Sequence, residues 1–475
     1  MHIVSLGCAR NDVDTEELAG RLESGGFLLV DEPDQAEAIV VNTCGFIESA
    51  KKDSIDTLLA ASDLKGHGPT RRVVAVGCLA ERYGRDLADS LPEADAVLGF
   101  DDYADIGALL RRIMAGERLE PHTPSDRRLL LPISPVARQE AASGIVIPGV
   151  SVPDGPDLPE GVAPASGPRV VRRRLGGGPS AAVKIASGCD RRCAFCAIPS
   201  FRGSFVSRPV EAVVDEVRWL VDRGVREAFL VSENTSSYGK DLGERDALQR
   251  LLAELNRVDG LDWIRVSYLQ PAEVRSGLIE TMCGLDKVVP YFDLSFQHAS
   301  PGVLRRMRRF GDPESFLELL ASIRELRPDA GVRSNVIVGF PGETDADVAI
   351  LEDFVTQARL DALGVFAYSD EEGTEAAGLP GHVDADAIAE RYERMSDLAV
   401  ALVDQRAEER LGQRVRVLVE SVEDGVTLGR AEHQGPEVDG TTSVPGAVLA
   451  VGDMVWGRVV ANDGVDLIAR EEASA

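Results

Sequence analysis

The sequence predicts a mixed α/β protein with three folded units, and three patterns support this fold class. Residues 1–115 alternate short β-branched runs with amphipathic stretches, which is typical of a parallel sheet covered by helices on both faces. Residues 181–406 repeat this alternation, which predicts a β/α barrel, complete or partial. From residue 407 the hydrophobic period shortens to two, which predicts a small antiparallel β barrel.

Composition and charge narrow the class of protein. The chain has 475 residues, too many for one ordinary domain, and 44% of them are hydrophobic, which is enough for packed cores. No apolar run approaches a membrane span, and the start MHIVSLGCAR lacks the features of a signal peptide. We therefore expect a cytoplasmic chain without membrane contact. The formal net charge of −28 argues against a coat for nucleic acid and favours solubility or a basic partner.

The first unit, residues 1–115, has four strand candidates: HIVSLGC, AIVVNTCGF, RRVVAVGC and DAVLGF. Helix-like patterns such as DTEELAGRLESGG and SAKKDSIDTLLAA follow them. Residues 116–180 differ, because the stretch PGVSVPDGPDLPEGVAPASGP is rich in Pro and Gly and has no periodicity. We interpret residues 116–180 as a linker that is partly disordered.

The second unit, residues 181–406, has helix patterns such as PVEAVVDEVRWLVDRG and ESFLELLASIREL between its strands. Its six strand candidates are AAVKIAS, EAFLVSEN, WIRVSYLQP, YFDLSFQHA, VRSNVIVGF and LGVFAYS. Such a barrel carries its active site at the C-terminal ends of the strands. After a long helix pattern, the third unit, residues 407–475, alternates in RVRVLVESVEDGVTLGRA and VWGRVVANDGVDLIAR, as a small β barrel does.

Three cysteines, Cys189, Cys193 and Cys196, lie directly after the first barrel strand, with Phe195 before the last. A zinc site with this spacing usually recruits a fourth Cys or His, and none lies nearby in the sequence. An iron–sulfur cluster on three thiolates leaves one iron open for an outside ligand, and soft thiolates suit such clusters. The spacing favours this open cluster, with a structural zinc loop as the alternative.

The pattern Cys-x3-Cys-x2-Cys, with an aromatic residue before the third cysteine, resembles the signature of the radical S-adenosylmethionine (SAM) enzymes. The resemblance implies a 4Fe-4S cluster on these cysteines, whose free iron chelates SAM before reductive cleavage to a 5′-deoxyadenosyl radical. It also implies that the glycine-rich turn in NVIVGFPGET contacts SAM, because glycine permits a close backbone approach. The candidates for the SAM pocket are Phe195, Ser232, Glu233, Gln297, Arg333, Gly339 and Gly342.

Three other cysteines, Cys8, Cys44 and Cys78, each close a predicted strand although they are far apart in the sequence. Parallel strands bring their C-terminal ends to one edge of a sheet, where open α/β folds bind ligands. We therefore expect the three thiols to converge and to hold a second open cluster. The alternative is burial as small apolar side chains. Cys283 belongs to neither group and is interpreted as a structural cysteine.

The segments SLGCARNDVDTE, VVNTCGFIESAKKDSIDTLL and VGCLAERY resemble the N-terminal domain of the methylthiotransferases, a subfamily of the radical SAM enzymes. The resemblance implies that Cys8, Cys44 and Cys78 hold an auxiliary 4Fe-4S cluster used in sulfur delivery. It also implies two roles for SAM, as radical source and as methyl donor. An electron donor such as flavodoxin or ferredoxin and a sulfur donor are the implied partners. We expect a monomer.

The methylthiotransferases divide by substrate, one branch modifying an adenosine of transfer RNA. Another branch methylthiolates the β-carbon of an aspartate in small-subunit ribosomal protein twelve. The segments IPSFRGSFVSRP, VSENTSSYG, PYFDLSFQHASPGVLRRMRR, GVFAYSDEEGT and GPEVDG resemble the second branch. The resemblance therefore implies a ribosomal protein as substrate, with transfer RNA as the alternative. A third hypothesis is an adaptor protein without catalytic activity, which is stabilised by zinc and binds ribosomes.

The third unit resembles the TRAM domain, which in RNA-modifying relatives grips nucleic acid and should be basic. From Leu411 onward, however, five Arg and no Lys stand against eleven Asp and Glu, a formal net charge of −6. Such a surface repels phosphates and attracts a basic protein. We therefore expect residues 407–475 to recognise the ribosomal protein. The alternative is that the acidity of the whole chain merely extends into this unit.

Overall fold

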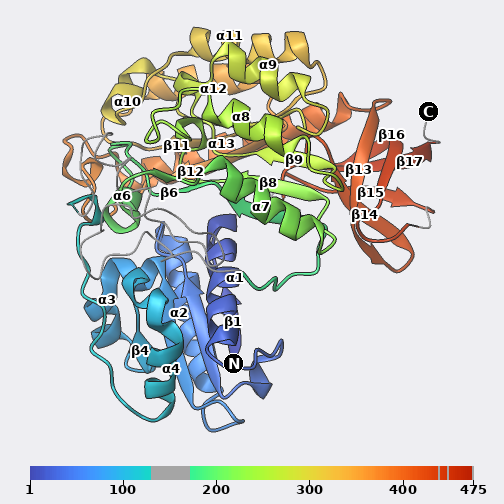
Figure 1. Ribbon diagram of the computed structural model, residues 1–475. Helices are drawn as coiled ribbons and strands as arrows, with labels where there is room; N and C mark the ends of the chain where they lie inside the picture. The colour runs from blue at the N-terminus through green and yellow to red at the C-terminus, as the bar shows by residue number, and fades with distance from the viewer. Residues whose placement is uncertain (130–171, 437–438, 447–448, 473–475) are drawn as a thin grey trace.

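The computed structural model describes residues 1–129, 172–436, 439–446 and 449–472, and most of the predicted linker lies outside these ranges (Figure 1). The N-terminal unit is a parallel sheet in the order β1-β2-β3-β4. Every residue of β2 (Ala38–Thr43) is buried, as expected for a β-branched strand with helices on both faces. The other elements are β1 (His2–Ser5), β3 (Arg72–Gly77), β4 (Ala96–Val97), α1 (Ala9–Ser24), α2 (Glu48–Asp63), α3 (Cys78–Ser90) and α4 (Ile106–Met114).

The central unit contains six parallel strands in two groups, β5-β8-β9 and β10-β11-β12. Single parallel bridges, Ile264 to Val288 and Leu269 to Leu294, join the two groups into a partial barrel. The strands are β5 (Ser180–Lys184), β8 (Glu227–Val231), β9 (Trp263–Val266), β10 (Tyr291–Gln297), β11 (Gly331–Val338) and β12 (Ala362–Ala367). The helices between them are α7 (Val210–Val221), α8 (Ala247–Leu255), α9 (Ser276–Gly284), α10 (Pro301–Arg306), α11 (Pro313–Leu326) and α12 (Asp345–Ala358).

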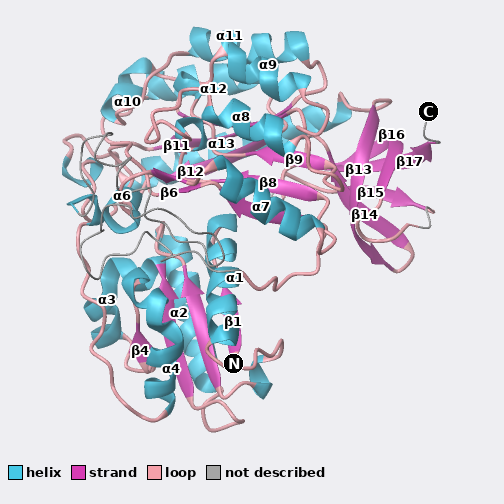
Figure 2. Cartoon of the chain, in the orientation of Figure 1, coloured by secondary structure: helices cyan, strands magenta, loops and turns pink. Residues whose placement is uncertain are grey.

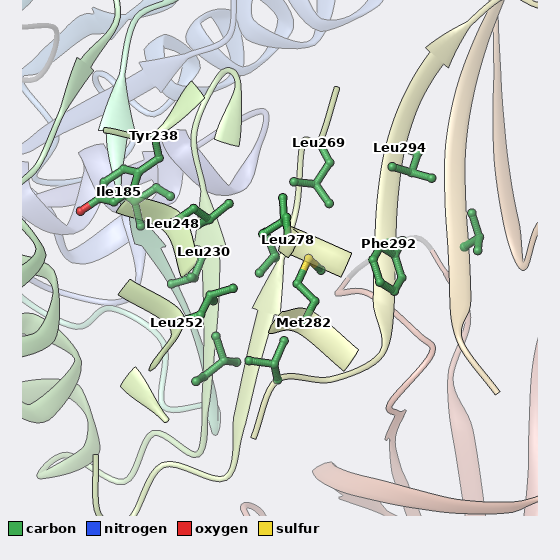
Figure 3. Packing of buried hydrophobic residues seen from close by; sticks show 14 of the residues in the cluster. Ile185, Leu230, Tyr238, Leu248, Leu252, Leu269, Leu278, Met282, Phe292 and Leu294 are labelled. Carbon is green, nitrogen blue, oxygen red and sulfur yellow. The ribbon is translucent and has the colours of Figure 1, made fainter. Parts of the chain in front are cut away.

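The largest apolar core lies between these strands and their helices (Figure 3). Strand residues such as Leu230 and Phe292 face helix residues such as Leu248 and Met282, and all four are at most 4% exposed. Removing this much apolar surface from water is the main favourable contribution to the fold. Cys283 packs partly buried against this core, away from the other six cysteines in the sequence and in the fold.

The C-terminal unit is a closed barrel in the order β13-β14-β15-β17-β16. Its strands are β13 (Arg414–Glu423), β14 (Val426–Ala431), β15 (Thr442–Pro445), β16 (Met454–Asp463) and β17 (Asp466–Glu472), reached through the long helix α13 (Ala385–Glu408). Figure 2 shows this unit built from strands, beside the mixed helices and strands of the other two. The predicted fold class is confirmed.

A buried ion network fixes the C-terminal barrel to the base of the central one. Arg430 of β14 pairs with Glu227 at the start of β8, and Arg265 of β9 donates to the same carboxylate at 2.6 Å. Burial alone would raise the pKa of Glu227, but Arg430 and Arg265 outweigh it and lower that pKa to about 2. Glu420, which the sequence places on the acidic strand β13, also pairs with Arg430 at 2.7 Å. Its charge is therefore engaged within the molecule.

Short elements complete the fold. They are β6 (Ala186–Ser187), β7 (Val206–Ser207), α6 (Ile198–Arg202) and the 3₁₀ turns Pro33–Gln35, Phe100–Asp105, Arg127–Leu129, Thr235–Ser237, Pro271–Glu273 and Ala376–Gly378. The described ends of the predicted linker are tied down, since Arg127 pairs with Glu81 at 2.8 Å and Arg172 pairs with Glu16 at 3.1 Å. Within the described ranges no helix combines the length and the apolar character of a membrane span.

Candidate active site

The loop between β6 and α6 carries Cys189, Cys193 and Cys196 at the C-terminal end of the first barrel strand. Backbone hydrogen bonds shape it: the N–H of Cys189 donates to the carbonyl of Gly203 at 3.0 Å, and that of Cys196 donates to Cys193 at 3.2 Å. The N–H of Arg191 points at the Cys189 sulfur at 3.4 Å. The loop is thus folded to present its sulfur atoms together.

Burial is the main cause of the pKa shifts of the thiols in this first triad. Burial raises the pKa of Cys189 and raises that of Cys196 to about 12, and the neighbouring thiols add to both shifts. The buried Arg309, which follows α10, opposes the increase in the pKa of Cys196, and its guanidinium lies 3.7 Å from the Cys193 sulfur. Sequence reasoning missed Arg309, because more than a hundred residues separate it from the cysteines. A bound cation would hold the sulfurs of Cys189 and Cys196 as thiolates against these shifts.

The second triad forms where β1, β2 and β3 end, as the sequence predicts. Cys8 is the N-cap of α1, Cys44 follows β2, and Cys78 is the first residue of α3. The three thiols lie close enough to act on one another, because Cys8 and Cys44 both raise the pKa of Cys78, after burial as the main cause. Two of the three sulfurs therefore lie at helix N-termini, where the helix dipole favours a thiolate.

Two glycines allow this convergence. Gly7 and Gly77 precede Cys8 and Cys78, and both have positive φ, +100° and +90°. A Cβ on Gly7 would lie 3.0 Å from the Cys44 sulfur, and one on Gly77 would lie 2.2 Å from the Asn42 side-chain oxygen. Any larger residue at either position would be strained in its backbone and would collide with the neighbouring strand.

Arg202 connects the two triads, although it belongs to α6 beside the first one. Its Nη2 lies 3.1 Å from the Cys78 sulfur and 2.7 Å from the Asn11 oxygen, and its Nη1 lies 3.0 Å from Asp14. Asp14 pairs in turn with Lys184 of β5, and both side chains are at most 1% exposed. The N-terminal unit and the barrel therefore share one buried ion network, and α6 lies at their boundary in Figure 1.

Arg10 lies between the two triads. Burial alone would raise the pKa of Cys8, but Arg10 and Arg202 outweigh it and lower that pKa. Arg10 also opposes the increase in the pKa of Cys196 that burial causes. Its Nη1 donates to the Ser232 carbonyl at 3.1 Å, and its guanidinium stacks 4.8 Å from the centre of the Tyr268 ring. One positive charge thus acts on a thiol of each triad.

The structure brings some predicted pocket residues close to this region. The predicted SAM residue Phe195 packs in a small apolar cluster with Phe340, which lies between the predicted glycines Gly339 and Gly342 in the turn after β11. Ser232 is buried, accepts from Arg10 through its carbonyl, and leads directly to Glu233. Glu233 lies between Arg10 and Arg202, at 3.9 Å and 3.7 Å.

Other predicted pocket residues have different neighbours. Arg333 directs its Nε toward Asp439 of the C-terminal barrel at 3.3 Å. The backbone of Gly339 approaches Ile388 of α13, where a Cβ would lie at 2.6 Å, and that of Gly342 approaches Arg306. Gln297 ends β10 with a positive φ of 69°. Positive φ at a non-glycine residue is a form of strain found at functional sites.

Neither cysteine triad forms a site for a single metal ion. Among the described residues, no three His, Cys, Asp or Glu side chains are arranged around one ion. Tetrahedral zinc would hold its thiolates within about 4 Å of one another, because each Zn–S bond is about 2.3 Å long. Three soft sulfur donors in each triad fit iron–sulfur ligation.

A cleft of about 600 Å³ borders the loop of the first triad, and Asn234 and Ser237, which follow β8, also line it. Asp190, Arg191 and Arg192 of the cysteine loop form one wall. Arg305, Arg308, Arg309 and the 75% exposed Phe310 form another. Arg192 and Arg305 are exposed and form no ion pair within the described part of the chain. The cleft therefore offers an arginine-rich surface on a strongly acidic protein, next to Arg309 and the Cys193 sulfur.

Three segments match known domain families. Residues 1–99 match the family described as Uncharacterized protein family UPF0004. Residues 183–355 match the Radical SAM superfamily, and residues 411–471 match the TRAM domain. These segments fall within the three units of the fold, and the first two contain the two cysteine triads.

Full-length relatives match as well. A protein of Cutibacterium acnes named Ribosomal protein uS12 methylthiotransferase RimO is 67% identical over 471 residues, covering 99% of this chain and 97% of that protein. A protein of the same name from Streptomyces coelicolor is 63% identical over 475 residues, covering 98% and 95%. The solved radical SAM methyltransferase TsrM from Kitasatospora setae covers 90% of this chain and 77% of its own, with 14% identity and a TM-score of 0.52, which supports the fold alone.

Proposed function

This chain belongs to the family of ribosomal protein uS12 methylthiotransferases, and from that premise we propose that it replaces a hydrogen on the β-carbon of a uS12 aspartate with a methylthio group. The enzyme is a radical SAM transferase that uses SAM and two 4Fe-4S clusters. We assign the radical cluster to Cys189, Cys193 and Cys196, and the auxiliary cluster to Cys8, Cys44 and Cys78. This assignment of ligands is the structural core of the proposal.

The observation that carries the proposal is that the two thiol triads share one buried boundary. Arg10 acts on Cys8 and Cys196, and Arg202 reaches Cys78 from the helix after Cys196. Hydrogen removal and sulfur transfer at a single carbon require both centres to face that carbon. The boundary between the N-terminal unit and the barrel meets this requirement.

The chain's own residues bind, orient and exclude water. When bound, the two clusters and SAM supply the radical, the sulfur and the methyl group that protein side chains cannot provide. The ion network of Asp14, Lys184 and Arg202 fixes the two units against each other, so the triads keep one separation. The side chains of Arg202 and Glu233 are at most 3% exposed, which keeps bulk water from the boundary.

We assign the SAM pocket to the barrel side of the first triad. Phe195 packs beside Phe340, so the turn with Gly339 and Gly342 lies near the cysteine loop. The carbonyl of Ala194 accepts from Ala376 at 2.8 Å, which closes this side of the loop. Ser232, Glu233 and Gln297 follow neighbouring strands on the same edge. Arg333 stays a candidate with the weakest support, because its guanidinium faces Asp439.

The electron donor is assigned to the arginine-rich cleft outside the first triad. An acidic redox protein such as flavodoxin or ferredoxin would meet the exposed Arg192 and Arg305, and Phe310 would supply an apolar contact. The same cleft is lined by Arg309, 3.7 Å from Cys193, so the donor would approach the cluster it reduces. We also propose that a partner supplies the sulfur, and that the enzyme is a monomer in the cytoplasm.

The experiment is a parallel reaction on both candidate substrates. The enzyme with both clusters is supplied anaerobically with SAM, sulfide and reductant, and then with purified uS12 or with transfer RNA. Mass spectrometry should find a methylthio group in place of one hydrogen on an aspartate of uS12. Modification of an adenosine in transfer RNA, with unmodified uS12, would contradict the proposed substrate.

A further inference from the structure

The ion group at the boundary of the two units has an unusual feature at its centre. The Glu233 side chain is 1% exposed, and neither of its oxygens has a hydrogen-bond partner within the described residues. Arg10 and Arg202 flank it at 3.9 Å and 3.7 Å, beyond hydrogen-bond distance. The Nε of Arg10 is likewise buried without a partner. Buried charged groups are normally hydrogen-bonded, so the ion pair between Arg10 and Glu233 is weaker than a hydrogen-bonded one.

The two arginines are not equivalent. Arg202 is occupied by Asp14, Asn11 and the Cys78 sulfur, at 2.7 to 3.1 Å. Arg10 donates to the Ser232 carbonyl, stacks on Tyr268 and interacts with the Cys8 thiol, but it makes no hydrogen bond to a carboxylate of the described residues. Guanidinium binds carboxylates through two parallel N–H groups, and Arg10 has its Nε free for such a pairing. Arg10 is therefore the arginine that can accept another carboxylate.

Tyr268 holds Arg10 in place for this role. It follows β9 with a positive φ of 60°, a strained conformation for a residue with a large side chain. Its N–H donates to Asp293 at 2.9 Å, which fixes the turn and places the ring under the guanidinium. Stacking on an aromatic ring leaves the edge of the guanidinium open for a planar partner.

We propose that Arg10 binds the side-chain carboxylate of the target aspartate, taking the place that the loosely paired Glu233 now occupies. This inference rests on the proposed function, because it identifies how the substrate side chain is recognised there. The β-carbon of aspartate is bonded directly to the carboxyl carbon. Anchoring the carboxylate on Arg10, between Cys8 and Cys196, therefore fixes the reacting carbon between the two triads.

The same contact selects the class of substrate. A guanidinium whose Nε has no hydrogen-bond partner favours an anionic ligand over a neutral side chain or an adenine ring. Glu233 compensates the charge of Arg10 before substrate binds. When the substrate carboxylate takes this place, Glu233 keeps Arg202 as its partner, which lies 3.7 Å away.

The test is a double-mutant cycle between Arg10→Met and an Asp→Asn change at the target residue of uS12. Dissociation constants are measured with the enzyme carrying both clusters and SAM. The native enzyme should bind the aspartate form about 10- to 100-fold more tightly than the asparagine form, and Arg10→Met should lose this preference. Arg21→Met removes a positive charge from the same helix, about 16 Å along it, and should keep the preference.

Arg10→Lys is the control that separates loss of the substrate contact from an indirect effect on the cluster at Cys8. It keeps the charge but loses the two-pronged donor, so the preference for aspartate should fall several-fold while iron content stays at the native level. A change in preference of fivefold or more with Arg10→Met supports the inference. If that variant loses iron, Arg10→Lys decides, and an unchanged preference there overturns the inference. Failure of native enzyme to modify uS12 would instead contradict the proposed function.

Discussion

Each cysteine triad brings three thiols together, but the structural cause differs between the two. Cys189, Cys193 and Cys196 lie on one loop, so the chain itself determines their proximity. Cys8, Cys44 and Cys78 come from three strand ends and meet only because the sheet is parallel. The first triad is thus a local site that depends on loop conformation. The second is a topological site that exists only in the folded N-terminal unit.

The electrostatic surroundings of the triads differ in the same way. Arg309 approaches the local triad at 3.7 Å from Cys193, and it comes from the same unit. Arg202 approaches the topological triad at 3.1 Å from Cys78, and it comes from the neighbouring unit. The auxiliary triad is therefore completed by a residue outside its own domain. The proposed ligand assignment therefore couples assembly of the two units to the tuning of the auxiliary cluster.

Losing the local triad should have the largest effect. Cys193→Ala removes a ligand of the proposed radical cluster, so reductive cleavage of SAM to 5′-deoxyadenosine and product formation should both disappear. The N-terminal cluster should remain, because its ligands lie in another unit. Iron analysis and chromatography of the nucleoside check this. Cys283→Ala, outside both triads, is the control and should retain activity. SAM cleavage by Cys193→Ala would disprove the assignment.

Losing the topological triad should separate the two reactions. Cys44→Ala should still cleave SAM under reductant, because the local triad is intact, but should form no methylthio product. Liquid chromatography of 5′-deoxyadenosine and mass spectrometry of uS12 measure the two activities in one sample. A Cys44→Ala enzyme that methylthiolates uS12 would show that the auxiliary cluster is wrongly placed.

The topological triad should also be sensitive to backbone strain where strands are in close contact. Gly77→Ala puts a Cβ 2.2 Å from the Asn42 oxygen at a φ of +90°, so it should cost more than about 2 kcal/mol of unfolding free energy. Gly66→Ala has a similar φ of +85° with nothing within 4 Å, and should cost about 1 kcal/mol. Denaturant unfolding with iron analysis compares them. Equal costs would mean that strand contact is unimportant here.

Charge removal should shift the two clusters independently. Arg202→Met removes a positively charged hydrogen-bond donor from the Cys78 sulfur. The reduced cluster is the more negative form and loses more stabilisation than the oxidised one, so the reduction potential of the auxiliary cluster should fall by roughly 60 mV. Arg309→Met should do the same to the radical cluster only. Redox titration followed by electron paramagnetic resonance resolves the two signals. A shift of both clusters by either change would contradict their separate environments.

The smallest effect concerns the donor cleft, which serves the local triad alone. Reversing the exposed Arg192 and Arg305 to Glu should slow reduction by flavodoxin several-fold at low salt, and less at high salt. Reduction by dithionite should be unchanged, because that reagent needs no docking surface. Stopped-flow absorbance at the two salt concentrations checks this. If reduction by dithionite slowed equally, the substitutions would have altered the cluster itself and not the docking surface.

The sequence was sufficient for features that are local or follow from topology. Spacing predicted the first triad, and the parallel sheet predicted that Cys8, Cys44 and Cys78 would meet. The shift to period two predicted the closed C-terminal barrel. Each of these depends on chain neighbours or on a general rule for strands, so no knowledge of the side-chain packing was needed.

Contacts between the units could not be predicted in this way. Arg10, Arg202 and Arg309 read as ordinary surface arginines, because most arginines are exposed. Their roles depend on the docking of α1 and α6 against residues that are distant in sequence. The acidic strand of the C-terminal barrel is a similar case, since Glu420 is engaged by Arg430 and a count of charges cannot reveal this. Arg333 likewise faces Asp439 across a unit boundary.

The central claim is that both triads serve one reaction on a ribosomal protein. Mass spectrometry of ribosomal proteins and of transfer RNA nucleosides from a strain lacking this chain tests it most directly. We expect uS12 to lose its methylthio group and transfer RNA to be unchanged. The native gene should restore the modification of uS12, whereas Cys193→Ala and Cys44→Ala should not. A fully modified uS12 in the deleted strain, with loss of a methylthioadenosine from transfer RNA, would contradict it.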